Sequence, residues 1–353
     1  MATDRDDTGF GSCPLPSAAG DEILLGHGSG GKLSAELTER VFLPAFDNPA
    51  LAPLDDAAVL AVNGDRLAFT TDSYVVSPIF FPGGDIGSLA VYGTINDLAM
   101  AGAEPRWLSL SLILEEGWSL AELGRVVASA RDAAAAAGVT VVTGDTKVVG
   151  RGSGDKIFVN TSGIGVIPAG VDVGSRHVAA GDVILLSGPI ADHGVTILAQ
   201  REGIGLAGDL RSDSAPLHGL VRALLAAAPG THALRDPTRG GVAATLCEIA
   251  TRRRVGIEVD ESAIPVRAPV RGACEILGLD PLHVANEGKL VAFVPEEQAE
   301  AALAALRAAP LGRGAVRIGT VTSEHAGVVV LRTPIGGNRI LDLPVGESLP
   351  RIC

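Results

Sequence analysis

Six aspartates stand where an apolar stretch begins or ends, or inside one. They are Asp55, Asp56, Asp72, Asp97, Asp145 and Asp236. Mg²⁺ takes oxygen ligands and usually combines carboxylates with nucleotide phosphates, so aspartates at strand ends could converge on one metal–phosphate site. Each one singly is typical of a turn or a helix cap. Asp97 differs, because it lies inside an otherwise apolar helical stretch where a charge needs a partner.

A glycine-rich segment near the N-terminus, Gly26 to Lys32, reads GHGSGGK. It matches the start of the phosphate-binding pattern G-x-x-x-x-G-K-[ST], but Leu33 stands where the Mg²⁺-binding hydroxyl belongs. Successive glycines still let backbone N–H groups approach an anion, with Lys32 as a point charge. A plain turn is the alternative interpretation.

Two further strings contain residues that could react. In Asn286-Glu287-Gly288-Lys289, an acid and an amine two residues apart precede an apolar strand. They could transfer protons, and a solvated turn is the alternative. The last residue, Cys353, could carry a group on a swinging tail, or it could be an ordinary chain end.

The other cysteines have simpler interpretations. Cys247 and Cys274 lie in apolar helical patterns, which predicts inert core residues, and Cys13 lies in a polar N-terminal arm. The spacing of all four excludes a disulfide framework or a zinc knuckle. The histidines show no paired-ligand spacing.

Composition limits the class of protein. The chain has 353 residues, enough for two domains, with 47% apolar and 20% charged residues and a net charge of −13. This acidity argues against general binding to nucleic acid or to an anionic membrane. No uncharged apolar run reaches the ~18 residues of a membrane span, and the polar N-terminus is no secretion signal. We therefore expect a cytoplasmic protein with free thiols.

The elements that must position these residues follow from periodicity. Residues 57–62 and 66–71 predict two strands around an Asn63-Gly64 turn. Residues 85–101 predict a helix, and Ser119 with Glu122 caps another that ends at Gly138. Further strands are predicted at 106–114, 139–143, 156–167, 182–187, 255–259, 289–294, 315–321 and 327–332. Further helices are predicted at 191–201, 216–227, 239–253, 267–277 and after Pro295. Both halves mix strands with helices, which predicts an α/β or α+β fold.

Several strings taken together resemble one family. They are GHGSGGK, DDAAVL, TTDSYVVSP, GTINDLAMAGAEP, TGDTKVV, DPTRGG, NEGK and the terminal PRIC. From about Asp21 to Cys353 the chain resembles HypE, the family of [NiFe]-hydrogenase maturation factors. NDLAM and GDTK are shared in looser form with the aminoimidazole ribonucleotide synthetase and selenophosphate synthetase superfamily, whereas PRIC is typical of HypE.

The resemblance implies a PurM-like fold of two α/β domains, with the N-terminal sheets of a homodimer pairing into a barrel-like core. The implied division is a disordered arm at 1–20, a glycine-rich segment at 21–45, an ATP-binding domain at 46–170 and a second domain at 171–342. A mobile tail, 343–353, ends in Cys353.

The resemblance also implies an activity. Cys353 would accept a carbamoyl group from HypF, and the chain would dehydrate it to a thiocyanate with ATP and Mg²⁺. The cyano group would pass to iron on the HypC–HypD complex. Cys353, Glu287 and Lys147 would be catalytic. Mg²⁺ or its phosphates would be held by Asp56, Asp72, Asp97, Asp145 and Asp236. Nucleotide contacts would also come from Lys32, Gly30, Gly31, Asn96, Gly144 and Thr146.

Two alternatives stay open. One is another ATP-dependent enzyme of the superfamily that acts on a small molecule, although the segment 26–32 lacks the reactive cysteine of the selenophosphate branch. The other is a non-catalytic carrier of a group bound to cysteine, against which the aspartates and GDTK argue.

Overall fold

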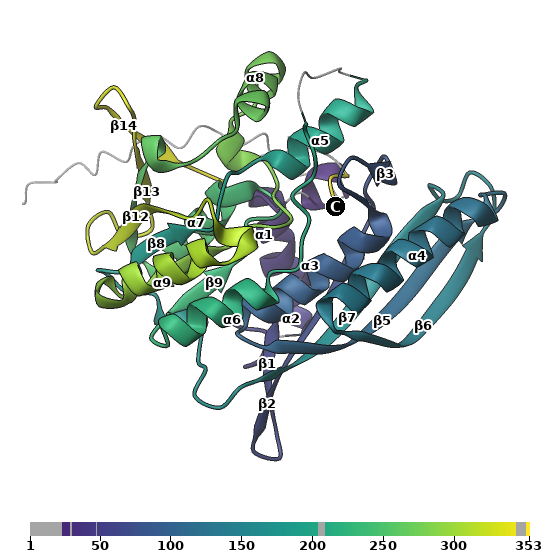
Figure 1. Ribbon diagram of the computed structural model, residues 1–353, viewed down its shortest axis with the longest axis horizontal. Coiled ribbons are helices and arrows are strands. Elements are labelled where there is room, and N and C mark those ends of the chain that lie inside the picture. Colours follow the sequence, from purple (N-terminus) through teal and green to yellow (C-terminus); the bar gives the residue numbers. More distant parts are fainter. Residues whose placement is uncertain (1–22, 29, 47, 204–208, 344–350) are drawn as a thin grey trace, which may run out of the picture.

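The computed structural model of the protein describes residues 23–28, 30–46, 48–203, 209–343 and 351–353. The predicted arm, with Cys13, and residues 344–350 of the predicted tail lie outside these ranges. Two units, each a sheet with its own helices, lie side by side (Figure 1). The prediction that both halves mix strands and helices is confirmed. None of the helices in the described part of the chain is long and apolar enough to cross a membrane.

The first sheet has five strands, and only its last pair is parallel. In spatial order the strands are β1 (Ala58–Val62), β2 (Asp65–Tyr74), β7 (Ile157–Ile167), β5 (Glu104–Glu115) and β6 (Thr140–Val149). The predicted Asn63-Gly64 hairpin joins β1 to β2, and both of its residues have positive φ. A short β3 (Phe80–Phe81) and β4 (Gly84–Asp85) form a separate ribbon before the first covering helix.

Helices α3 (Ile86–Met100) and α4 (Leu120–Ala137) cover one face of this sheet (Figure 1). Strand β7 alternates buried and half-buried residues along its whole length, so one row of side chains meets α3. The approach is close, because a Cβ on Gly163 would lie 2.8 Å from Leu98. Asp85 caps the N-terminus of α3 through the N–H groups of Gly87 and Ser88, which fixes where the helix starts.

The opposite face of the first sheet is open. Strand β6 is exposed from Thr140 to Val148. On the side away from α3, the exposed large apolar side chains are Leu60, Val62, Phe69, Trp107 and Ile113, with Val142 exposed at the irregularity of β6. We call this surface the open face. An apolar surface of this kind is typical of a protein–protein contact.

The second sheet has seven strands, and its two faces are covered unequally. The spatial order is β14 (Asn338–Leu341), β13 (Val329–Arg332), β10 (Gly256–Asp260), β12 (Val316–Thr322), β8 (Val183–Leu186), β11 (Val291–Val294) and β9 (Ala233–Arg235). One face packs on the apolar core that contains helices α7 (Gly241–Arg253) and α8 (Ala268–Leu277). The other packs on α6 (His218–Ala227) and α9 (Glu296–Ala308) only around β8, β11 and β9.

Two strands of this sheet were not predicted. Strand β9 has three residues, too few to show an alternation, and β14 is exposed except for Leu341. Near the N-terminus, α1 (Lys32–Leu37) and α2 (Leu43–Phe46) flank a π-helical turn at Thr38–Phe42. Helix α5 (Asp192–Arg201) completes the second unit and faces the first.

Candidate functional site

The site begins where β2 and α3 of the first unit face the second unit. Asp72 on β2 accepts a hydrogen bond from the hydroxyl of Thr94 at 3.0 Å, and Asp97 on α3 accepts one from Thr70 at 2.8 Å. Burial raises the pKa of both carboxyls, and that of Asp97 is raised well above its usual value because Asp72 and Asp236 add repulsion. The charge inside the apolar helix therefore has hydroxyl partners and carboxylate neighbours.

The second unit supplies the facing charges from the end of β9 and the residue that follows it. The guanidinium of Arg235 lies 2.7 Å from Asp56, and these side chains are 12% and 10% exposed. Burial nevertheless raises the pKa of Asp56 well above its usual value, and raises that of Asp236 to about 6. Four of the five predicted metal-binding aspartates thus belong to one electrostatically linked cluster.

This cluster fits a cation only in part. One oxygen of Asp56 and one of Asp236 are buried without a hydrogen-bond partner, and burial raises the pKa of both carboxyls. Yet no three acidic, histidine or cysteine side chains of the described chain are placed to hold a metal ion. Mg²⁺ commonly takes one or two carboxylates and completes its shell with phosphates and water, so the donors fit Mg²⁺ that arrives with a nucleotide.

The last residues of the chain dock into this cluster. The carbonyl oxygens of Cys353 and Arg351 accept hydrogen bonds from the backbone N–H groups of Val75 and Ser77, at 3.0 and 3.2 Å. Ile352 is 3% exposed and belongs to the apolar core under α3. Figure 1 shows this chain end near β3, between α3 and α5. The predicted tail thus has a bound end.

The thiol of Cys353 lies among the charged groups of the site. Burial raises its pKa to about 12, with Arg239 opposing this shift and Glu287, Asp72 and Asp236 adding to it. Conversely, Cys353 is the largest influence that raises the pKa of Arg239. Arg239 is exposed, so the cluster is open to solvent on its side. A neutral thiol at neutral pH is a poor nucleophile.

Glu287 is a buried acid that interacts electrostatically with the same cluster. It is 3% exposed, and burial, with repulsion from Asp236 and Asp213, raises its pKa well above the usual value. Its backbone is held on both sides: the N–H donates to Asp213 at 3.1 Å and the carbonyl accepts from Asn96 at 3.2 Å. Lys289, the amine of the NEGK string, instead pairs with Asp213 at 2.9 Å.

Asn96 lies at the junction of the two units. Its amide N–H₂ donates to the carbonyls of Ala215 and Glu287, and its oxygen accepts from the N–H of Leu217 at 2.8 Å. All three partners are backbone groups of the second unit. This predicted nucleotide contact therefore also fastens α3 to the segment that carries Glu287.

The glycine-rich segment lies against the DPTRGG loop. Gly30 has positive φ, and a Cβ there would come within 2.9 Å of Arg239, whose guanidinium donates to the carbonyl of Gly28 at 3.3 Å. Gly31 precedes α1, and Lys32 at its start pairs with Asp342 at 2.7 Å. The segment thus borders the cluster, while the ammonium of Lys32 has an acidic partner.

The predicted residues on β6 lie elsewhere. Asp145 and Lys147 pair with each other at 2.5 Å, both more than half exposed. Across the sheet Asp145 is in register with Ser111, Asn160 and Ser73, so it shares the open face with them, whereas Asp72 points toward α3. Three strand spacings separate β6 from β2, roughly 14 Å. Gly144 and Thr146 lie on the same strand. Within one chain these residues do not join the cluster.

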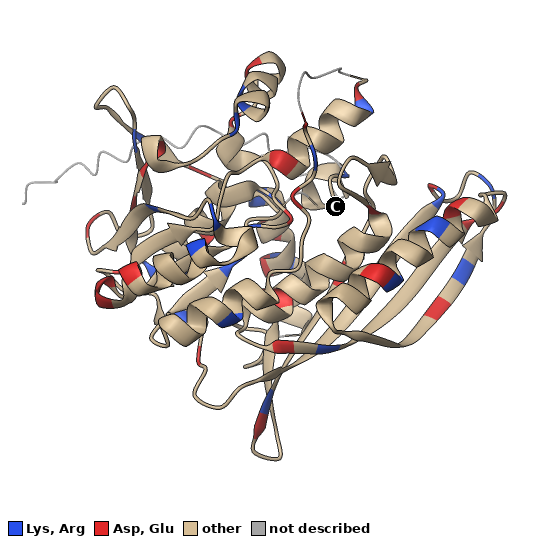
Figure 2. Ribbon diagram, in the orientation of Figure 1, with Lys and Arg blue, Asp and Glu red and all other residues tan. Residues whose placement is uncertain are grey.

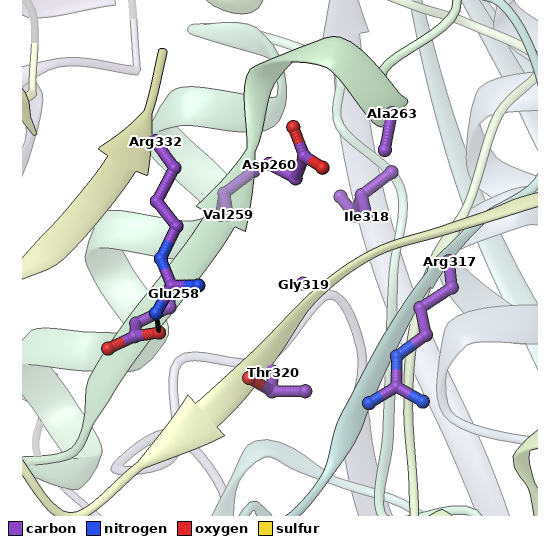
Figure 3. A pocket seen from close by; sticks show the side chains of 9 residues that line it. All are labelled: Glu258, Val259, Asp260, Ala263, Arg317, Ile318, Gly319, Thr320 and Arg332. Atoms are coloured by element: carbon purple, nitrogen blue, oxygen red, sulfur yellow. Dashed lines mark hydrogen bonds and ion pairs between the residues drawn. The ribbon is translucent and has the colours of Figure 1, made fainter. Parts of the chain in front are cut away.

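A cavity in the second unit contains none of the predicted residues. It has a volume of about 240 Å³ and lies over β10, β12 and β13 (Figure 3). Arg332 pairs there with Glu258, and Arg317 pairs with Glu296 through two contacts of 2.8 and 2.9 Å. Acidic and basic residues are interspersed over both units of the described chain (Figure 2). The cavity's arginines are thus already neutralised.

Several residues of the site were not singled out from the sequence. Arg235 and Asp213 neutralise buried partners, and His193 and Arg201 contact the docked chain end. Arg239 was quoted only within the string DPTRGG. Of these residues, His193 had the one local signal in the sequence. It follows Asp192 in the first turn of the helix predicted at 191–201.

Comparisons with known proteins agree with this geometry. Residues 54–167 and 179–332 match the N-terminal and C-terminal domain families of AIR synthase related proteins. The chain is 56% identical to "Carbamoyl dehydratase HypE" of Azotobacter vinelandii over 331 residues, which covers 94% of this chain and 97% of that one. The chain belongs to the HypE family of carbamoyl dehydratases. The family resemblance and the mixed α/β, two-domain PurM-like fold are thereby confirmed.

Two solved HypE structures extend the comparison. One, "Crystal structure of HypE-HypF complex", has a TM-score of 0.83 and 45% identity, covering 87% of this chain and 99% of that one. Another, a HypE "in complex with ATP", has a TM-score of 0.80 and 54% identity, covering 94% and 100%. HypE proteins of this similarity thus include one bound to HypF and one bound to ATP.

Proposed function

We infer that this chain uses ATP to dehydrate a carbamoyl group on its own Cys353, giving the thiocyanate that supplies cyanide to the iron of [NiFe]-hydrogenase. The observation that carries this proposal is the docked end: the backbone of Cys353 pairs with Val75, and its thiol interacts electrostatically with Arg239, Glu287 and the aspartates. Membership of the HypE family supports the same reaction.

The reaction balances as a dehydration coupled to phosphoryl transfer. The oxygen of the S-carboxamide takes the terminal phosphoryl group of ATP, and the nitrogen loses one proton as a C=N bond forms. Departure of phosphate with that oxygen and loss of the second N–H proton complete the C≡N bond. The products are the S-cyano cysteine, ADP and phosphate. Two protons leave one nitrogen, so a positioned base is required.

Glu287 is proposed to accept those protons. Burial raises the pKa of its carboxyl, which increases its affinity for a proton. Asp213 and Asn96 hold its backbone, so the carboxyl stands on a fixed support. Arg239 lies beside the sulfur and favours negative charge developing there.

ATP is proposed to bind with Mg²⁺ against the aspartates. Asp56, Asp72, Asp97 and Asp236 would hold the ion and the phosphates, and the unpartnered oxygens of Asp56 and Asp236 support this. Bound Mg²⁺ would neutralise charge on the transferring phosphoryl group. Gly30 and Gly31, next to Arg239, would close over the nucleotide, and Lys32 would have to leave Asp342 to take part.

The chain is proposed to act as a homodimer that joins through the open face. Burying the exposed apolar side chains of β1, β2, β5 and β6 favours such a contact. Asp145 and Lys147 stand on this face with Gly144 and Thr146 beside them, so their proposed roles would be exercised toward a second copy. Lys147 would then assist proton transfer across the interface.

HypF is the proposed carbamoyl donor and the HypC–HypD complex the proposed cyanide acceptor, all in the cytoplasm. The HypE–HypF complex among the similar structures supports the first partner. Transfer to either partner is proposed to need the thiol of Cys353 outside its docked position, since a neutral, half-buried thiol is a poor nucleophile there.

Intact-mass spectrometry tests the proposal. Carbamoylation should add about 43 Da to the chain and incubation with Mg-ATP should then remove about 18 Da, with one ATP hydrolysed per conversion. Cys353→Ala should show neither change, while Cys247→Ala and Cys274→Ala should show both. An adduct that forms but never loses 18 Da would favour a carrier, and an adduct on Cys353→Ala would refute the proposed nucleophile.

A further inference from the structure

Backbone pairing alone does not determine how the chain end sits in the site. Arg351 and Cys353 direct their carbonyls to the segment 75–77, as alternate residues of a strand do. If the chain end shifted by two residues along this segment, the same alternation would be kept. The thiol of Cys353 would then lie two residues away from its place in the cluster. Other contacts must set the register.

Two side chains of α5 supply such contacts. The Nε2 of His193 lies 2.9 Å from the carbonyl oxygen of Ile352, which points away from the paired segment. Arg201 donates from Nη2 to the carbonyl of Arg351 at 2.9 Å and, through Nε and Nη2, to the carbonyl of Ser77 at 3.0 and 2.7 Å. We propose that His193 and Arg201 are positioning residues that fix the register of residues 351–353 and so place the Cys353 thiol beside Arg239 and Glu287.

The hydrogen-bond network assigns the tautomer that His193 needs. The hydroxyl oxygen of Ser212 accepts the N–H of Ser214 at 3.1 Å, so its own hydrogen is available to Nδ1 of His193 at 2.7 Å. Nε2 then carries the imidazole proton and donates to Ile352. Burial lowers the pKa of His193, which keeps the ring neutral and this assignment intact.

The contacts join both units through the chain end. His193 and Arg201 belong to α5 of the second unit, whereas Val75 and Ser77 follow β2 of the first. Arg351 adds a side-chain contact to the first unit by donating to the carbonyl of Val75 at 3.0 Å and pairing with Asp155. Ile352 fills the apolar core between them. The tripeptide is therefore held by backbone, side chain and apolar contacts, with the thiol directed at the cluster.

His193 also packs against Phe81, edge to face with ring centroids 5.7 Å apart, so a test must separate positioning from packing. Two amide side chains do this. In His193→Gln the amide nitrogen can occupy the place of Nε2 and donate to Ile352. In His193→Asn the shorter amide reaches only the place of Nδ1 beside Ser212. Both variants lose the ring, and only Gln restores the donor to the chain end.

The experiment measures how fast iodoacetamide alkylates Cys353 in the full-length chain carrying Cys13→Ser, read by intact mass. Loss of one hydrogen bond, about 1 kcal/mol, predicts roughly five- to tenfold faster alkylation in His193→Asn and in Arg201→Met. His193→Gln should stay within about twofold of the parent. His325→Asn and Arg222→Met, on exposed residues outside the site, are matched controls and should react like the parent.

Equal acceleration in the Gln and Asn variants at unchanged melting temperature would show that His193 acts through packing and would overturn its role. Unchanged alkylation in His193→Asn or Arg201→Met would overturn the proposal directly. If His193→Asn fails to fold, Ser212→Ala decides the histidine's part, because losing the donor to Nδ1 should accelerate alkylation, and no acceleration would refute it.

A second measurement rests on the proposed function. In the carbamoylated chain, Arg201→Met should slow dehydration in a single turnover by a similar factor without changing the affinity for Mg-ATP. If the parent chain itself does not dehydrate the adduct, the proposed function fails, while the alkylation result still decides whether these residues position the chain end.

Discussion

The ammonium of Lys289 lies 2.9 Å from the carboxylate of Asp213, and both side chains are almost fully buried. Burial alone would raise the pKa of Asp213, but the ammonium of Lys289, which attracts and hydrogen-bonds the carboxylate, outweighs it, so the pKa is lowered and the carboxylate stays charged. The same carboxylate holds the N–H of Glu287. The buried pair of Lys289 and Asp213 has no part in the proposed reaction, but it holds the backbone of Glu287, the proposed base.

Breaking this pair on one side should be costly. Lys289→Met would leave a buried carboxylate without a counter-charge, and the free energy of unfolding should fall by about 3–5 kcal/mol. Adding Asp213→Asn to Lys289→Met should recover much of the loss, because the remaining amide is neutral. Urea denaturation measures both. A Lys289→Met chain as stable as the parent would contradict the pairing.

Glu287→Gln should separate binding from chemistry. The amide has the same size and cannot accept a proton, so Mg-ATP affinity should change by less than about threefold while conversion of the carbamoyl adduct falls by 10²-fold or more. Calorimetric titration and intact mass give the two readings. Weakened nucleotide binding with normal conversion at saturating ATP would identify Glu287 as a binding group instead.

Asp97→Asn should weaken Mg-ATP binding and leave the fold intact. The neutral amide suits a buried position whose carboxyl already has a strongly raised pKa, so stability should hold or rise. Nucleotide affinity should fall roughly tenfold or more for loss of one charged ligand. Asp132→Asn, on the exposed surface of α4, is the control. Unchanged titration curves in both variants would remove Asp97 from the site.

Asp236 predicts a pH dependence of stability. Its pKa is raised from 3.8 to about 6, so between these values the folded chain holds a proton that the unfolded chain has released. The contribution of this carboxyl to the free energy of unfolding is therefore fully present below pH 3.8. It is lost as the pH rises to about 6, at a rate of at most about 1.4 kcal/mol per pH unit. Asp236→Asn should remove this loss. A parent–variant stability difference that stays constant from pH 4 to 6.5 would argue against the shift.

The open face predicts a dimer that one charge disrupts. Ile113→Lys places an ammonium among the exposed apolar side chains of the open face, and light scattering at micromolar concentration should shift from dimer toward monomer. Ile276→Lys, at a residue also apolar and exposed but on α8, should leave the mass unchanged. A parent chain that is monomeric would end the proposal for this face and for Lys147 acting on a second copy.

Much of the fold could be predicted from short sequence patterns. The Asn63-Gly64 turn, the cap at Ser119 and the left-handed Gly138 lie where their chemistry predicts, because each depends on a few neighbouring residues. Strands β9 and β14 escaped notice because β9 has only three residues and β14 is exposed except for Leu341, so neither shows an alternation. They exist because the sheet already formed offers them an edge.

The site was predictable in part for a similar reason. Aspartates at element ends and the acid of NEGK do meet, since strand ends and loops of both units face each other there. The side of the sheet on which Lys147 lies could not be predicted, because it depends on how β6 pairs with β5. His193, Arg201 and Asp213 take their roles from partners more than 70 residues away, and no local pattern marks such partners.

The amide of Asn96 restricts how the molecule can open. Asn96 is 1% exposed, and separating α3 from the second unit would break its bonds to Ala215, Leu217 and Glu287 together. Each of these hydrogen bonds contributes about 0.5–1.5 kcal/mol, so together they hold the junction closed. The proposed path for a nucleotide is then the solvent side at Arg239, which the glycine-rich segment borders in the described part of the chain.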